Sequence, residues 1–171
     1  GDTINRMKKR AYGFTIVELL IVIVVIAVLA AISIVAYTGI QNRANDTSVR
    51  SDLNNIAKKI EIYRASTDSY PTNTVAALTQ ALDGMQVAKA VYGNGLNSNA
   101  TNIIYCLSTD RSKFGLAAWS TSGKAFAVIN GLVQDFNYPA AVSATTCPRL
   151  VTPYTVGGHF WFKEEGTWRV L

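Results

Sequence analysis

The side chains that could do acid–base or metal chemistry are scattered through this 171-residue sequence. The single histidine, His159, stands after two glycines and before an aromatic run, where a turn or strand residue is expected rather than a general base. No histidine or cysteine cluster joins the nine acids of the last three quarters of the chain: Asp46, Asp52, Glu61, Asp68, Asp83, Asp110, Asp135, Glu164 and Glu165. A CxxC pair and a glycine-rich phosphate loop are also missing from the sequence. We therefore expect no enzymatic activity, no metal site and no cofactor.

One further acid, Glu18, stands where a charge is costly. Residues 19–36, which follow it directly, carry a single polar side chain, the hydroxyl of Ser33, and a helix can bond that hydroxyl to its own carbonyls. A charge deep in a bilayer costs about 2.5 kcal/mol or more on insertion scales, and less near the interface. Glu18 is thus a functional candidate, and its carboxylate needs a partner that remains to be found.

The apolar run around Glu18 predicts a membrane-spanning helix. Residues 14–36 would extend roughly 34 Å at about 1.5 Å per residue, enough for a hydrocarbon core of about 30 Å. A lone strand would leave its backbone unpaired in lipid. Because Lys8, Lys9 and Arg10 precede the run, the positive-inside tendency keeps that flank cytoplasmic, and the chain after Thr38 is expected outside.

Two other targeting segments share part of this pattern. A secretory signal peptide has a shorter apolar region and a small-x-small cleavage site; Ala30, Ala31 and Ala36 supply small residues, but the run is longer and continues in a helical pattern. An ordinary signal anchor would have the same basic flank, but it would have no reason to contain Glu18. Both are therefore less favoured than a segment in which the acid has a role.

The formal charge of +5 does not indicate nucleic-acid binding. Four basic residues against Asp2 supply +3 of it before Gly13, and these are Arg6, Lys8, Lys9 and Arg10. From Gly39 onward twelve Lys and Arg residues stand against nine acids, a balance too even for a basic binding surface.

The N-terminal segment resembles the class III signal of type IV pilins and the related pseudopilins. The resemblance covers about residues 8–64 and is carried by Lys8-Lys9-Arg10-Ala11-Tyr12-Gly13-Phe14-Thr15-Ile16-Val17-Glu18 and the apolar run. It implies that a membrane prepilin peptidase cuts after Gly13 and methylates the new N-terminal Phe14, and that Glu18 is needed for subunit assembly. A glycine before the cut would also let the backbone enter a narrow site.

The resemblance also divides the chain. Residues 1–13 would be a cleaved leader, in which Met7 would start a seven-residue signal, and residues 14–38 the membrane half of a long helix. Residues 39–66 would be its amphipathic half, and residues 67–171 a globular head. The family usually has a proline, which bends or loosens a helix, at the position of Val35; Gly39 is the nearest helix-weakening residue left.

The second half of the helix is readable from its periodicity. Apolar residues recur at spacings of four and three: Val49, Leu53, Ile56, Ile60 and Tyr63. With no proline between Phe14 and Tyr70, this amphipathic segment should continue the membrane helix for about 50 residues, until the turn-forming residues 66–72 end it.

The head reads as a small antiparallel sheet. After a helical stretch at 75–91 and a loop at 93–99, short β-rich runs occupy 102–108, 114–120, 124–130, 158–163 and 167–171, with turns at 121–123 and 164–166. The alternation of Phe126 with Val128, and of Phe160 with Phe162, gives each strand one face for the helix. The expected fold is α+β, a long N-terminal helix packed against a small antiparallel sheet.

Cys106 and Cys147 are the two cysteines of the chain, and both lie in the part expected outside the membrane. An even count in an oxidising compartment predicts a disulfide between them, and a pair of buried free thiols is the alternative.

The function that the resemblance implies is structural: a type IV pilus subunit that supports adhesion, motility or DNA uptake. Its implied partners are copies of itself in a helical filament, the prepilin peptidase, a pilus assembly platform and the cytoplasmic membrane. The chain would cross that membrane once, with its N-terminus inside, and then become part of an extracellular pilus.

Other functions share the N-terminal pattern. A type II secretion pseudopilin would usually carry a calcium site in its major form, for which the C-terminal half offers no acid cluster. A minor pilin that captures DNA would need a basic surface. A membrane-anchored protein that never polymerises is opposed mainly by Glu18.

Overall fold

A computed structural model describes residues 13–72, 74–83, 85, 87–93, 101–137, 143–154, 159–162 and 167–170. The chain forms two compact units, Gly1–Ile40 and Gln41–Leu171. A single helix, α1 (Ile16–Thr67), runs from the first unit into the second. The predicted α+β class is confirmed, with one long N-terminal helix and an antiparallel sheet.

α1 is continuous over 52 residues, as the absence of proline predicts. In the first unit the helix is exposed along its whole length, and two of its hydroxyls bond to its own backbone. The Ser33 hydroxyl donates to the Leu29 carbonyl at 2.8 Å, and the Thr38 hydroxyl donates to the Val35 carbonyl at 2.9 Å. Val35 therefore lies in regular helix and presents no polar group to its surroundings.

The end of α1 lies one residue beyond the predicted position. The Thr67 hydroxyl donates to the Tyr63 carbonyl at 2.8 Å, and the Asp68 amide donates to the Arg64 carbonyl at 2.8 Å. Asp68 has a φ of 60°, the left-handed conformation with which many helices end. Pro71 follows and prevents the helix from resuming.

Within the described residues, the sheet of the second unit has six strands in the order β4-β3-β2-β1-β5-β6, and all neighbours are antiparallel. Five strands match the predicted runs closely: β1 (Thr101–Leu107), β2 (Phe114–Trp119), β3 (Ala125–Ile129), β5 (His159–Phe162) and β6 (Thr167–Val170). The turn predicted at 121–123 joins β2 to β3, with Gly123 at a φ of 87°. The predicted turn at 164–166 and most of the loop at 93–99 lie outside the described residues.

The structure contains two elements that the sequence pattern does not predict. Strand β4 (Leu132–Asp135) pairs with β3 through a two-residue turn in which Asn130 and Gly131 have φ angles of 51° and 78°. Helix α3 (Ser143–Leu150) precedes the last two strands and contains Pro148.

The helical stretch predicted at 75–91 is shorter than expected. It divides into α2 (Val75–Ala81), capped by the Thr74 hydroxyl, and a single 3₁₀ turn, η1 (Lys89–Val91).

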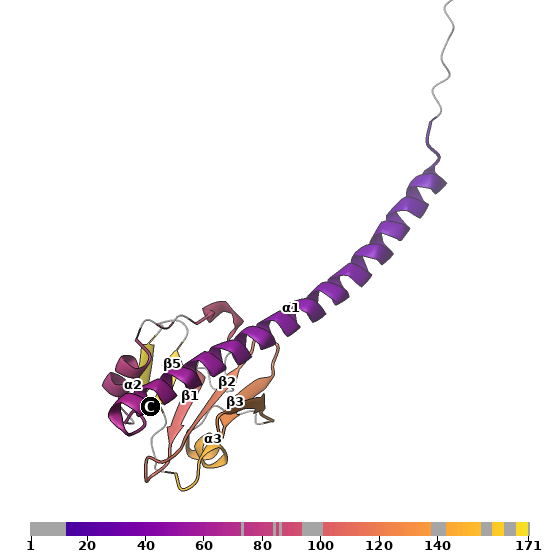
Figure 1. Cartoon of the computed structure of the whole chain (residues 1–171). Coiled ribbons are helices and arrows are strands. Elements are labelled where there is room, and N and C mark those ends of the chain that lie inside the picture. Colours follow the sequence, from indigo (N-terminus) through magenta and orange to yellow (C-terminus); the bar gives the residue numbers. More distant parts are fainter. Residues whose placement is uncertain are drawn as a thin grey trace, which may run out of the picture. The chain divides into compact units, whose positions relative to one another are not determined.

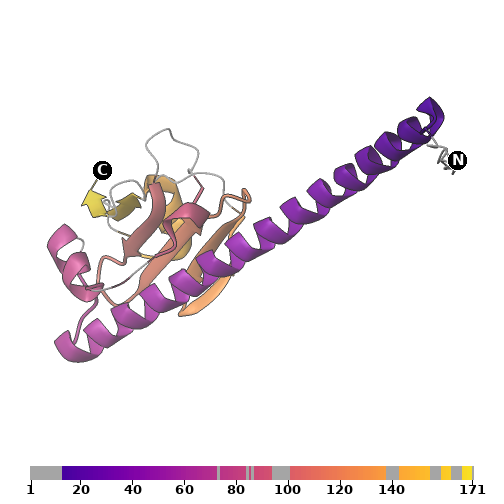
Figure 2. The ribbon, with the colours of Figure 1, turned by 90° about the horizontal axis from the view of Figure 1, so that it is seen from above.

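The sheet lies between two helical layers (Figures 1 and 2). On one face, the α1 stripe of Val49, Leu53, Ile56 and Ile60 forms a core with alternate residues of β1, β2 and β3, Phe126 and Val128 included, as predicted. On the other face, residues of the same strands meet α3: Ile104, Cys106, Ala117 and Ala127 against Cys147 and Leu150. Because successive strand residues point to opposite faces, β1 to β3 are buried on both sides.

Gly115 in β2 permits the close approach of α3. A Cβ atom at this position would lie 2.6 Å from the Cβ of Leu150, a distance that two carbon atoms cannot adopt without a backbone shift. The glycine is therefore required by packing, since a larger residue would push α3 away from the sheet.

Candidate functional site

The start of α1 is closed by a reciprocal cap between Thr15 and Glu18. The Glu18 amide donates to the Thr15 hydroxyl at 3.2 Å, while the Thr15 amide and hydroxyl both donate to the Glu18 carboxylate at 2.8 Å. This is a capping box, which satisfies backbone donors that the first helical turn leaves free. Within the isolated chain, Glu18 therefore has a partner on its own helix.

Sequence reasoning assigned no role to Thr15, although the signature was readable. A threonine followed three residues later by a glutamate, just before an apolar run, is the usual pattern of a capping box.

Gly13 and Phe14 lie just before α1, in exposed and non-helical backbone. A Cβ atom on Gly13 would meet no atom within 4 Å among the described residues, and Phe14 is 82% exposed. The described part of the fold therefore leaves room for a side chain at position 13.

The first half of α1 presents a continuous apolar surface. Its best 18-residue window has a mean hydropathy of 3.4, and none of that window is buried in the structure. By length and composition the helix is able to cross a membrane. An apolar surface of this size marks contact with lipid or with other protein.

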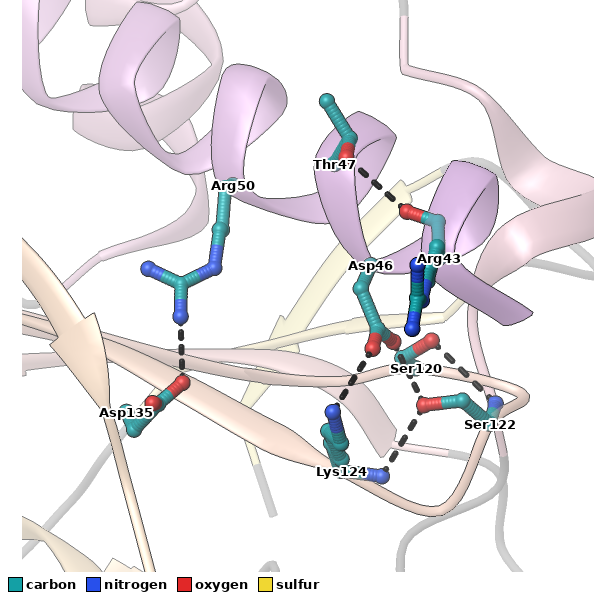
Figure 3. A network of polar contacts seen from close by, with 8 residues as sticks. All are labelled: Arg43, Asp46, Thr47, Arg50, Ser120, Ser122, Lys124 and Asp135. Carbon is teal, nitrogen blue, oxygen red and sulfur yellow. Dashed lines mark hydrogen bonds and ion pairs between the residues drawn. The ribbon is translucent and has the colours of Figure 1, made fainter. Parts of the chain in front are cut away.

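Polar side chains also bind the second half of α1 to the sheet, in addition to the apolar core that the two share (Figure 3). Asp46, which is buried, accepts a hydrogen bond of 2.5 Å from the Ser122 hydroxyl and lies 3.5 Å from the Lys124 ammonium. Arg50 pairs with Asp135 of β4 and lies 4.4 Å above the ring of Phe126. These contacts attach α1 to the β2–β3 turn and to the sheet edge.

Further contacts hold the rest of the helix. The Asp52 carboxylate accepts hydrogen bonds from the Tyr92 hydroxyl at 2.8 Å and from the Ala88 amide at 3.1 Å. Near the end of α1, the Tyr70 hydroxyl donates to Glu61 at 2.9 Å and accepts from Arg64 at 3.0 Å. Asp46, Asp52 and Glu61 therefore attach α1 to the rest of the second unit.

Replacement of Asp46 by asparagine is expected to destabilise the second unit by about 1–2 kcal/mol at pH 7, because a charge-assisted hydrogen bond in a buried site is weakened. Burial raises the pKa of Asp46, but hydrogen bonds from Ser122 and Ser120 and the nearby Lys124 ammonium outweigh it and hold the pKa below the usual value. A depressed folded-state pKa stabilises the fold above the unfolded-state pKa of about 3.9, and this contribution is lost as the pH falls through the folded-state pKa.

Denaturant unfolding between pH 7 and pH 3 measures this effect. The wild-type chain should lose more stability over that interval than the Asp46→Asn variant does. The matched control is Asp135→Asn, in the same network but with its side chain 80% exposed, which should change stability by less than about 0.5 kcal/mol. Equal pH profiles for the wild type and Asp46→Asn would contradict the role given to Asp46.

The other histidine and acidic residues considered as candidates from the sequence are dispersed in the structure. His159 lies in β5, as a strand residue, and Asp110 is held by the serines of its own loop. In the parts of the chain that the structure describes, no three His, Cys, Asp or Glu residues gather as metal ligands would. Glu164 and Glu165 lie outside those parts.

Cys106 of β1 and Cys147 of α3 form a disulfide in the structure, with their Cα atoms 5.4 Å apart. Both residues are fully buried in the second core, between the sheet and α3. The bond therefore fixes α3 to the sheet and closes a loop that contains β2, β3 and β4.

Comparison with known proteins gives a family match and three partial relatives. The profile of the prokaryotic N-terminal methylation motif matches residues 8–34. The chain is 43% identical over 74 residues to the type IV wide pilus major component PilA4 of Thermus thermophilus, covering 43% of this chain and 56% of that protein.

Two further relatives are type II secretion system core proteins G. The one from Dickeya chrysanthemi is 30% identical over 66 residues, covering 39% of this chain and 43% of that protein. The one from Aeromonas hydrophila is 29% identical over 65 residues, covering 38% of this chain and 46% of that protein. The matches thus span about half the length of these relatives, and no solved structure matches the chain significantly. Together they support the resemblance to type IV pilins and pseudopilins.

Proposed function

We propose that this chain is a structural subunit of a type IV pilus, assembled through the apolar half of α1. The observation that carries the proposal is the exposed apolar surface of residues 14–40, with the acid Glu18 near its start. Lipid covers such a surface while the subunit is stored in the cytoplasmic membrane, and identical helices cover it in a filament. Transfer from one to the other need not expose it to water.

In this proposal a prepilin peptidase removes residues 1–13 on the cytoplasmic side and methylates Phe14. The open surroundings of Gly13 support this, because the glycine is then required by the narrow site of the peptidase rather than by the fold. Cleavage leaves the apolar run on the mature chain and creates a positively charged amino group four residues before Glu18. The membrane half, residues 14–38, thereby becomes the assembly element.

Glu18 would exchange partners during assembly. In the isolated chain its carboxylate is bound by Thr15, and in a staggered bundle it would meet the amino group of a neighbouring copy. Two charges buried in the bundle then neutralise one another, and removal of one leaves the other buried and alone. The residues after Thr38, with the disulfide of the head, would lie outside the cytoplasm, where such bonds persist.

A type II secretion pseudopilin is the second candidate. It is favoured by the two core proteins G among the relatives, and it would use the same leader, membrane helix and glutamate. The two candidates differ in where the assembled protein is found: a pilus subunit is abundant on the cell surface, and a pseudopilin remains with its secretion apparatus.

Mass spectrometry of material sheared from the cell surface tests the proposal. We expect an abundant chain that begins at methylated Phe14 and contains one disulfide. An abundant surface chain that still carries residues 7–13 would contradict the assigned cut. Absence of the mature chain from the sheared fraction, with the same methylated chain in the membrane fraction, would instead support the pseudopilin.

A further inference from the structure

The Cys106–Cys147 disulfide is closed off from solvent in the folded head. Both cysteines are 0% exposed, and Leu150 and Val151 beside them are 5% and 4% exposed. The bond lies in the core between the sheet and α3, among apolar side chains of β1, β2 and β3. Exchange between a thiol and a disulfide requires that a thiolate reach one of the two sulfur atoms. While α3 is packed on the sheet, the pair is therefore out of reach of oxidants and reductants alike.

The last turn of α3 covers the bond. Cys106 of β1 stands directly opposite Gly115 of β2 in the antiparallel register. Leu150 packs on that glycine, so closely that a Cβ atom at position 115 would lie 2.6 Å from the Cβ of Leu150. Leu150 also lies one helical turn after Cys147, on the same face of α3. Separation of α3 from the sheet would therefore uncover both cysteines together.

Formation of the bond needs more room than the closed core gives. The thiolate of one cysteine attacks a disulfide carried by an oxidant, a mixed disulfide forms, and one sulfur of the oxidant leaves as a thiolate. The thiolate of the second cysteine then attacks the sulfur of the first and releases the other sulfur of the oxidant. Two electrons pass to the oxidant, and each cysteine gives up its proton. Because the oxidant stays attached to the chain between the two attacks, α3 cannot be packed at that stage.

We propose that a disulfide-bearing oxidant makes the Cys106–Cys147 bond while α3 is still separate from the sheet, and that packing of α3 then protects the bond from exchange. The compartment of this step rests on the proposed function, which places the head outside the cytoplasm; the order of events rests on the burial of the two cysteines. A head that packed α3 before oxidation would keep two buried, unreactive thiols. The oxidant is therefore a partner of the unpacked chain and not of the finished subunit.

The rate of reduction of the full, oxidised chain in detergent tests the protection. Dithiothreitol is added to the folded chain and to the same chain in urea, and acid-quenched samples are followed by mass spectrometry for the gain of two hydrogens. Reduction of the folded chain should be at least about a hundredfold slower, because the reductant has to wait for the core to open. Comparable rates for the folded chain and the chain in urea would overturn the proposal.

Two leucine variants show whether α3 alone is the cover. Leu150→Ala removes the side chain that packs α3 on the sheet, and Leu78→Ala on α2 removes an equal, fully buried side chain from the core on the other face. Reduction of folded Leu150→Ala should be at least about tenfold faster than that of the wild type, and reduction of Leu78→Ala should stay within about a factor of two. Equal acceleration in both variants would mean that the whole head has to unfold, and it would overturn the role given to α3.

The reverse reaction tests the order of events. The wild-type chain is reduced in urea and treated with oxidised glutathione, either in urea or after the urea has been removed. Formation of the bond should be at least about a hundredfold slower once the urea is gone, because the packed core shields both thiols. Equal rates would show that oxidation can follow packing and would overturn the proposed order. These measurements need no filament, so a failure of the proposed function would leave their outcome unchanged.

Discussion

Replacement of Glu18 by glutamine is expected to abolish surface filaments as completely as replacement by alanine does. Glutamine keeps an oxygen that can accept the two hydrogen bonds from Thr15, so the cap of α1 survives, but it removes the negative charge. Breaking one side of a buried ion pair costs about 3–5 kcal/mol per interface, whereas loss of a cap costs about 1 kcal/mol. Counts of filaments by electron microscopy, at equal chain in the membrane, measure the difference.

Thr15→Val is the matched control for this prediction. It removes the hydroxyl of the cap and leaves the Glu18 carboxylate in place, so filament counts should stay within about a factor of two of the wild type. Normal assembly of Glu18→Gln together with failure of Glu18→Ala and Thr15→Val would show that the acid acts only as a cap. The charge pairing proposed for the filament would then be wrong.

The parts of this fold that the sequence predicted are those with local causes. A run without proline gave one continuous α1, and the stripe of Val49, Leu53, Ile56 and Ile60 faces the sheet because a helix repeats every 3.6 residues. The central strands followed from β-rich runs between turn-forming residues. Each of these features is decided by neighbours in the chain, so the pattern alone was sufficient.

The missed elements depend on distant residues or on a signal that was overlooked. Helix α3 is short and contains Pro148, so local propensity does not predict it. It is held in place by the disulfide to β1, and Gly115 of β2 leaves room for it to pack closely on the sheet. Strand β4 was readable from Asn130-Gly131, the strongest short hairpin signal, but its exposed residues do not show the alternation of a half-buried strand.

The candidate site was predicted in part. The acid at position 18 was identified by its cost in an apolar run, and the structure adds its bond to Thr15. The attachment of α1 through Asp46 and Asp52 could not be predicted, because their partners Ser122 and Tyr92 are 76 and 40 residues away in the sequence and only the folded sheet brings them near. Glu61 binds the nearby Tyr70, but no sequence pattern marks that pair.

Reduction of the Cys106–Cys147 disulfide is expected to lower the free energy of unfolding of the head by about 4 kcal/mol, since the bond closes a loop with a sequence separation of 41 residues. The sulfur atoms stay in the same buried place after reduction, so the loss comes chiefly from the greater freedom of the unfolded chain. Urea unfolding of the full chain in detergent, followed by near-ultraviolet circular dichroism with and without a reductant, measures the difference.

The Cys106→Ala/Cys147→Ala variant separates the bond from other effects of the reductant. These are the only cysteines of the chain, so its unfolding should be the same in both conditions. Its stability should lie below that of the reduced wild type, because two buried sulfur atoms are removed and a cavity is left between β1 and α3. Coincident curves for the oxidised and reduced wild type would show that the bond contributes nothing to the head. We expect stability to fall in the order oxidised wild type, reduced wild type, double-alanine variant. The first difference then measures loop closure, and the second, smaller difference measures the packing of α3 on the sheet.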